Sequence, residues 1–349
     1  MDGLLPIQGI CDIVNEYGQA LEGHCVQVLP DGHTVRVLAV LPHNKLAAAS
    51  FSIIRIWDTA SGCCVHTLRG HTHLIVKLAV VKLSVLDTLL VSAGMDNIRI
   101  WDTLRGTCVH AFAHCGRPNG MLVWGENLAI SSGDAVRLWN LETCAWSRKL
   151  EGHTNTVTAM EVCRERCGER CGEGSLASGS RDATVRVWDE NGCAHVLTGH
   201  THIVFALAPL PDNRLASSSS DRSVRVWDTQ AGLCLFTLEG HARSVEALAF
   251  NGKLISGAHD HTLRVWDIET GECLHELNGY GQGVRGLAVM PGNMIASFSV
   301  DKNVQIWDVE SGVIFLELVG HTEGIMCAIS LPDGKFASGS LDCSLRVWK

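Results

Sequence analysis

The sequence of 349 residues lacks the features that mark several large classes of protein. It has no stretch of 18 apolar residues, which a membrane-spanning helix would need. No run of Lys or Arg interrupts the net charge of −9, which argues against nucleic acid or an anionic membrane as the main partner. Residues 1–20 lack the basic start and long apolar core of a signal peptide. We therefore expect a cytoplasmic or nuclear protein.

Familiar catalytic motifs are also missing. The sequence contains no Gly-Lys-Ser/Thr phosphate-binding loop, no His-Glu-x-x-His zinc motif and no Gly-x-Ser-x-Gly nucleophile elbow. We therefore predict a protein that is not an enzyme and that has no catalytic residue, no cofactor and no metal site.

A repeat fills nearly the whole chain. Eight segments of similar sequence, such as Val-Arg-Val-Trp-Asp, contain Trp57, Trp101, Trp139, Trp188, Trp227, Trp266, Trp307 and Trp348, which are 44, 38, 49, 39, 39, 41 and 41 residues apart. Within each unit, β-branched residues alternate with polar ones at period two, and turn formers such as Pro211–Asn213 separate these runs. Four short strands per unit predict a radial array of four-stranded sheets that pack on their neighbours.

The Gly-His at the start of a unit and the Trp-Asp near its end resemble the WD-repeat β-propeller family over residues 21–349. The resemblance implies an all-β fold with a single propeller, preceded by an N-terminal extension at residues 1–20. The last unit stops in its third strand, whereas residues 23–29 resemble a fourth strand. We expect eight blades, closed by an N-terminal strand that completes the last blade. A ring of seven blades is the alternative.

In that family, a His, a Ser or Thr, an Asp and the Trp form a buried hydrogen-bonded quartet in each blade. The chemistry suits such a chain, because an indole N–H only donates and a carboxylate only accepts, while hydroxyl and imidazole groups relay between them. The resemblance gives five full quartets: His71/Ser92/Asp96/Trp101, His153/Ser178/Asp182/Trp188, His200/Ser217/Asp221/Trp227, His241/Ser256/Asp260/Trp266 and His321/Ser338/Asp342/Trp348.

Three units depart from the quartet, and we expect their blades to be less stable. The first has His33 and Trp57 but Ala48 in the Ser position, the third has His114, Asp134 and Trp139 but Ile130 in that position, and the seventh has Tyr280 in place of His.

The sequence has fifteen cysteines. Cys25, Cys64, Cys108, Cys193, Cys234 and Cys273 occupy equivalent positions in successive fourth strands, with Cys144 close to that register. We interpret these as packing residues, since a residue that recurs once per blade indicates packing. Cys163, Cys167 and Cys171 belong to a different stretch, residues 161–174. We predict a lengthened hairpin loop there, with a metal or redox site and a docking loop as alternatives.

The resemblance also implies a binding surface for proteins or peptides at one rim of the central channel. Its residues lie five positions after the Gly-His histidine or its replacement (Leu38, Val76, Thr158, Phe205, Glu246, Arg285, Met326) and just before the turn Asp (Met95, Gly133, Arg181, Ser220, His259, Val300, Leu341). Arg181 and Arg285 are three blades apart with Glu246 between them, which does not favour a phosphopeptide site.

We therefore predict a non-catalytic scaffold for other proteins or peptides, a monomeric propeller within a larger complex. The alternative is a substrate-recognition subunit of a ubiquitin ligase. The Arg that follows Trp-Asp in relatives that dock a cullin-ligase adaptor is absent here, where Ala60 and Leu104 occupy that place in the first two units.

Overall fold

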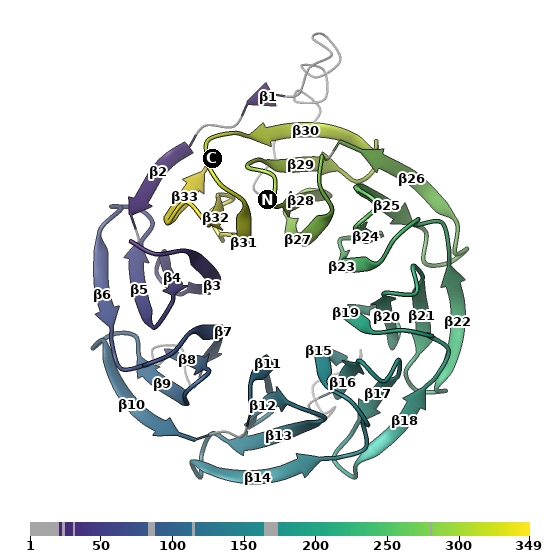
Figure 1. Ribbon diagram of the computed structural model, residues 1–349, viewed down its shortest axis with the longest axis horizontal. Coiled ribbons are helices and arrows are strands. Elements are labelled where there is room, and N and C mark those ends of the chain that lie inside the picture. Colours follow the sequence, from purple (N-terminus) through teal and green to yellow (C-terminus); the bar gives the residue numbers. More distant parts are fainter. Residues whose placement is uncertain are drawn as a thin grey trace, which may run out of the picture.

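The computed structural model shows a closed ring of eight antiparallel sheets, each of them one blade (Figure 1). It describes residues 21–22, 25–30, 32–82, 88–113, 116–163, 174–279 and 281–349, and no helix occurs among them. The N-terminal extension predicted at residues 1–20 lies outside this part of the chain. The prediction of an eight-bladed, all-β propeller is confirmed, and the seven-bladed alternative is wrong.

In blades 1 to 7, four consecutive strands run in sequence order from the centre of the ring to its circumference (Figure 1). Blades 1 to 4 consist of β3 (Val35–Leu41), β4 (Lys45–Ser50), β5 (Ile53–Asp58) and β6 (Cys64–Leu68); β7 (Ile75–Lys82), β8 (Thr88–Gly94), β9 (Ile98–Asp102) and β10 (Thr107–Phe112); β11 (Pro118–Trp124), β12 (Asn127–Ser132), β13 (Ala135–Asn140) and β14 (Ala145–Leu150); and β15 (Val157–Cys163), β16 (Ser175–Ser180), β17 (Val185–Trp188) and β18 (Cys193–Leu197).

Blades 5 to 8 continue this pattern around the ring. They consist of β19 (Val204–Leu210), β20 (Arg214–Ser219), β21 (Val224–Asp228) and β22 (Leu233–Leu238); β23 (Val245–Phe250), β24 (Leu254–Ala258), β25 (Thr262–Trp266) and β26 (Cys273–Asn278); β27 (Val284–Met290), β28 (Met294–Ser299), β29 (Val304–Asp308) and β30 (Val313–Leu318); and β31 (Ile325–Ser330), β32 (Phe336–Ser340) and β33 (Ser344–Trp348).

The hydrophobic core lies between neighbouring blades. One cluster, for example, joins Ile54 and Ile56 of blade 1 to Leu90 and Trp101 of blade 2. The second strands are buried almost throughout, because both of their faces meet another blade. The outermost strands bury little more than a leucine near their end, such as Leu197 in β18. A blade therefore depends on its neighbours for most of its apolar burial.

An N-terminal strand closes the ring. Strand β2 (Cys25–Pro30) pairs antiparallel with β33 and supplies the outer strand of blade 8, which confirms the predicted closure. Leu29 lies opposite Leu345 and is only 3% exposed. A further short strand, β1 (Leu21–Glu22), pairs parallel with β30 of blade 7, and the sequence analysis did not predict it.

Candidate functional site

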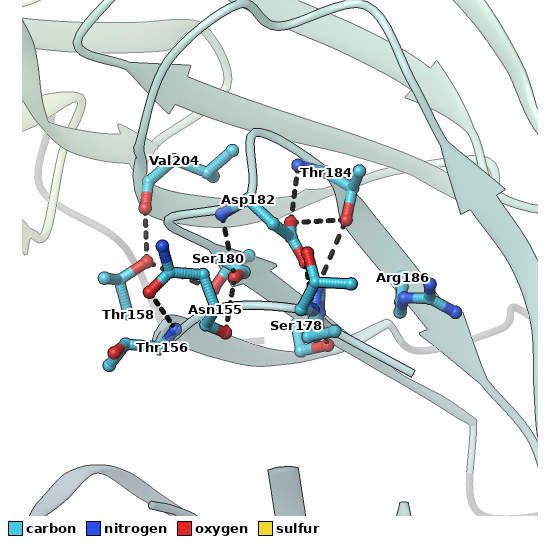
Figure 2. Close-up of polar contacts among 12 residues, drawn as sticks. Asn155, Thr156, Thr158, Ser178, Ser180, Asp182, Thr184, Arg186 and Val204 are labelled. Atoms are coloured by element: carbon cyan, nitrogen blue, oxygen red, sulfur yellow. Dashed lines mark hydrogen bonds and ion pairs between the residues drawn. The ribbon is translucent and has the colours of Figure 1, made fainter. Parts of the chain in front are cut away.

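A hydrogen-bonded chain of four side chains runs through five of the blades. In blade 4, Trp188 Nε1 donates to Ser178 Oγ at 2.8 Å, and Ser178 Oγ lies 2.8 Å from His153 Nε2. His153 Nδ1 in turn lies 2.8 Å from Asp182, whose surroundings Figure 2 shows. The same chain, with distances of 2.7–2.9 Å, joins the predicted residues of blades 2, 5, 6 and 8.

The serine at the centre of each chain has no exposed surface. In all five blades its hydroxyl accepts from the tryptophan indole and lies beside the histidine ring; these serines are Ser92, Ser178, Ser217, Ser256 and Ser338. The tryptophans and histidines around them are at most 7% exposed. The predicted quartet serines are therefore structural, because none of their surface is open to a partner.

The charge states in these quartets follow from burial and hydrogen bonding. Burial lowers the pKa of His153, His241 and His321, which favours neutral imidazole. A neutral ring can accept the Ser O–H at Nε2 and donate from Nδ1 to the Asp. Burial by itself would raise the pKa of Asp96, but hydrogen bonds from the Thr72 N–H and from the histidine lower it to about 2. In blades 4, 6 and 8, where the pKa of the aspartate is lowered as well, the carboxylate is thus ionised and the imidazole neutral at pH 7.

Four quartets have a fifth member that the sequence analysis missed. Thr184 Oγ1 donates to Asp182 Oδ1 at 2.6 Å, as Figure 2 shows. The equivalent hydroxyls in blades 5, 6 and 8 belong to Ser223, Thr262 and Ser344. A hydroxyl residue two positions after the turn Asp is the signal that could have identified them.

The blades that depart from the quartet leave polar atoms unsatisfied. Among the described residues, the buried indole nitrogens of Trp57 and Trp139 have no hydrogen-bond partner. In blade 7, Trp307 Nε1 still donates to Ser297 at 2.8 Å. His114 and Tyr280, which the sequence analysis assigned to the quartet positions of blades 3 and 7, lie outside the described residues.

His33 does not occupy a quartet position, contrary to the sequence analysis. Its side chain is exposed, and it lies two residues before the first strand-forming residue, Val35. In blade 5, His200 precedes the equivalent Val204 by four residues. The connection in blade 1 is therefore two residues shorter than the pattern assumed.

The same short connection explains why Leu38 is wrongly assigned to the rim. Leu38 is 9% exposed and packs in the core between blades 8 and 1. The pairing of the first two strands shows that Arg36, which is exposed, is the equivalent of Phe205. The inner positions of the rim are thus Arg36, Val76, Asn119, Thr158, Phe205, Glu246, Arg285 and Met326.

The turns between second and third strands form the outer positions of the same face. They are Phe51, Met95, Gly133, Arg181, Ser220, His259, Val300 and Leu341. Val300, Leu341, Phe51 and Met95 belong to consecutive blades, 7, 8, 1 and 2, and are 43%, 38%, 56% and 47% exposed. We call these four residues the apolar arc. Phe51 was missed because its turn lacks the Asp used to locate the others.

A pocket lies beside Phe51, at one point of the apolar arc. It measures about 420 Å³ and is lined by His33, Thr34, Arg36, Phe51 and Leu74. We call it the arc pocket. It combines an exposed aromatic ring with a guanidinium group, so it can accept an apolar side chain beside a carboxylate.

Polar rim residues on the other side of the ring make contacts within the protein. Thr158 Oγ1 donates to the backbone carbonyl of Val204, and the contact ties blade 4 to blade 5 (Figure 2). Asn119 makes the same kind of bond to Val157 at 3.2 Å. Glu246 Oε1 lies 2.8 Å from His259 Nε2. The polar groups of these blades are thus partly satisfied within the protein.

The periodic cysteines are not buried packing residues, contrary to the sequence analysis. Cys64, Cys108, Cys193, Cys234 and Cys273 are exposed, and Cys25 is half-buried. Each pairs with the blade's tryptophan at a β-bulge, and each thiol lies 3.2–3.4 Å from the carbonyl two residues later. Cys144 lies outside this register, in the turn before β14.

Of the stretch at residues 161–174, residues 161–163 belong to β15, and residues 164–173, where the hairpin loop was predicted, lie outside the described residues. Cys163 ends β15, is 4% exposed and packs in the core, and burial raises the pKa of its thiol to about 12. A protonated core thiol is a poor metal ligand. Cys167 and Cys171 lie outside the described residues. Among the residues that the structure describes, no three His, Cys, Asp or Glu side chains gather as metal ligands would. No helix in the described ranges could cross a membrane.

Comparisons with known proteins match this architecture. The family model described as "WD domain, G-beta repeat" matches residues 62–102, 144–189, 191–228, 232–267, 271–308 and 312–349. Nuclear distribution protein PAC1 of Arthroderma benhamiae is 30% identical over 188 residues, 52% of this chain and 32% of that protein. WD repeat-containing protein pop2 of Schizosaccharomyces pombe is 31% identical over 97 residues, 27% of this chain and 12% of that protein.

These curated relatives are much longer than the matched region, since the chain spans about a third of their length or less. Among solved structures, the computationally designed Ika8 protein superposes with a TM-score of 0.79 at 25% identity. That match covers 94% of this chain and 98% of the designed one.

Proposed function

The chain belongs to the family of proteins built from WD domains, or G-beta repeats, and from this premise we propose that it is a non-catalytic scaffold for protein partners. The apolar arc and the arc pocket bind a partner protein or peptide. The scaffold works as a monomeric propeller, with residues 21–349 as the propeller and residues 1–20 as its extension. It acts within a larger complex in the cytoplasm or nucleus.

The apolar arc is the observation that carries this proposal. Four large apolar side chains, each 38–56% exposed, follow one another across four blades on one face. Exposed apolar side chains gathered on one side of a face are typical of interaction sites, whereas scattered single apolar residues are not. The opposite side of the same face has Gly133, Arg181, Ser220 and His259 at the equivalent positions.

The arc pocket indicates the chemistry of the occupant. An aromatic anchor such as Phe51 in a concave site is typical of binding hot spots. Arg36 lines the same pocket. Arg285 is exposed on blade 7, the blade at one end of the arc. We infer that the partner presents an extended segment in which an apolar side chain stands next to Asp or Glu.

A displayed library of random peptides, selected on the full chain, tests this function. We expect selected peptides to carry an apolar residue beside an acidic one. Phe51→Ala should weaken their binding about 30-fold, the effect of losing a hot spot of about 2 kcal/mol. Arg36→Glu should weaken acidic peptides most, because it reverses the charge in the pocket.

Ser220→Ala is the matched control, since Ser220 occupies the equivalent turn on the polar side of the face. It should bind like the wild type, and all three variants should keep the wild-type melting temperature. Peptides that bind Phe51→Ala and wild type equally would refute the assignment. Association of the full chain with cullin or other ubiquitin-ligase subunits would instead support the ligase alternative.

A further inference from the structure

A cysteine and a histidine meet in a second pocket, between blades 2 and 3. Cys144 Sγ lies 3.5 Å from His110 Nε2. The pocket measures about 510 Å³, and its walls include the aliphatic side chains of Leu89, Ile100 and Leu141. Its lining includes the turns between third and fourth strands of blades 2 and 3, which lie on the face opposite the apolar arc.

Cys144 occupies a position that five other blades give to glycine. The equivalent residues in the turn four positions after the Trp-Asp aspartate are Gly62, Gly106, Gly232, Gly271 and Gly312, with φ between 69° and 75°. A Cβ atom at Gly106 would lie 2.6 Å from the ring of His66, which belongs to the preceding blade. Cys144 has φ 51°, in the left-handed region that non-glycine residues seldom adopt.

The histidine beside it also differs from its equivalents. His66 and His275 hold the same strand position as His110, and their Nε2 atoms lie 3.0 Å from backbone carbonyls of the next blade. In blade 2, His110 instead contacts the sulfur atom of Cys144 in blade 3. The pair is therefore specific to this junction and is not part of the repeat.

We propose that Cys144 and His110 form an S-acylation site that accepts an aliphatic acyl group from a thioester. The imidazole of His110 takes the thiol proton, and the Cys144 sulfur attacks the acyl carbonyl carbon. The new C–S bond forms as the donor's C–S bond breaks. The departing thiolate takes the proton from His110, and the protein retains the acyl group as a thioester.

The pocket suits an acyl chain better than a polar ligand. Its volume lies within the range of about 300–1,000 Å³ that is typical of small-molecule sites, and Cys144 packs against the apolar cluster of blades 2 and 3. The charged groups beside it are Asp102 and Arg105, which pair with each other at 2.7 Å. Arg105 is 81% exposed and can contact an anionic donor such as coenzyme A.

The test is to incubate the full chain with octanoyl coenzyme A and to measure acylation of each cysteine by peptide mass spectrometry. The exposed thiols Cys64, Cys108, Cys193, Cys234 and Cys273 are internal controls, because a backbone carbonyl, not an imidazole, accepts from each of them. We expect Cys144 to react about 100-fold faster than these, the usual contribution of a positioned base.

Two variants make the result decisive. His110→Gln should slow acylation of Cys144 about 100-fold at pH 7, and its rate should then rise steeply with pH while the wild-type rate changes little. Cys144→Gly restores the residue of the other blades, so it should fold normally and abolish acylation in this pocket. Equal labelling of all exposed cysteines, or an unchanged rate in His110→Gln, would overturn the proposal.

Discussion

At the scale of single residues, the Ser hydroxyl is the hub of each quartet. Ser178 Oγ accepts from Trp188 Nε1 and lies within hydrogen-bond distance of His153 Nε2. Where Ser is replaced, the buried indole loses its acceptor, as it has at Trp57. An unsatisfied buried donor costs about 1–3 kcal/mol, so blade 1 carries a defect that one hydroxyl could repair.

Ala48→Ser should therefore stabilise the protein by about 1 kcal/mol, the net value of a typical hydrogen bond. Ala48 is fully buried and pairs with Arg55, in the register that places Ser178 beside its tryptophan. Urea unfolding measures the change. Ala47→Ser is the control, because Ala47 packs in the cluster on the other side of the strand and has no indole to satisfy. A gain from Ala47→Ser as large as that from Ala48→Ser would contradict this explanation.

Quartet residues could be named from the sequence because their spacing is rigid. The Ser precedes its Trp by nine or ten residues in all five full quartets, since a fixed hairpin joins them. The rim residues are harder to identify from sequence spacing than the quartet residues. They were located from the histidine across a connection that is two residues shorter in blade 1, so Leu38 was chosen in place of Arg36.

At the scale of elements, the outer strands show where a pattern of period two fails. Six of them have a bulge where a cysteine faces the tryptophan, for example between Val187 and Trp188 in the pairing of β17 with β18. A bulge shifts the alternation by one residue, and the outermost strand has no blade beyond it. The recurrence of cysteine therefore identified a structurally equivalent position in successive blades. It did not show that this position is exposed.

The closing strand β2 is the element whose contribution can be measured separately. Leu29→Ala should destabilise the protein by about 2–5 kcal/mol, the cost of a cavity at a well-packed site. Leu29 packs with Leu345 and Val347 of blade 8 and with Leu46 and Trp57 of blade 1. The loss should appear as a lower midpoint of urea unfolding.

Val26→Ala in the same strand is the matched control, because Val26 is 45% exposed. It should change stability by no more than about 0.5 kcal/mol. If both variants lose the same stability, the strand contributes through its backbone pairing alone and the core contact of Leu29 is unimportant.

At the scale of the whole molecule, the quartets repeat one charge arrangement around the ring, so their responses to pH add. Burial lowers the folded-state pKa of His153, His241 and His321 below the value of 6.5 that they have when unfolded. Below that pH the unfolded chain binds more protons than the folded one. Stability must then fall as pH decreases.

We expect the free energy of unfolding to be greatest above pH 6.5 and to decrease below it, by up to about 1.4 kcal/mol per pH unit for each of these histidines. A second decrease should begin near pH 3.8 and continue towards pH 2, because hydrogen bonds hold the pKa of Asp96 and Asp342 at about 2 in the folded state. Urea unfolding from pH 8 to pH 3 measures the first decrease and the start of the second.

His241→Gln separates this explanation from general acid sensitivity. Glutamine does not titrate, so the variant should be less stable at pH 8 but should lose stability less steeply between pH 6.5 and pH 5 than the wild type. The slope should drop by the contribution of one histidine, because the equivalent pairs of the other blades are intact. An unchanged slope would mean that protons are taken up elsewhere, and the quartets would then not be the origin of the acid response.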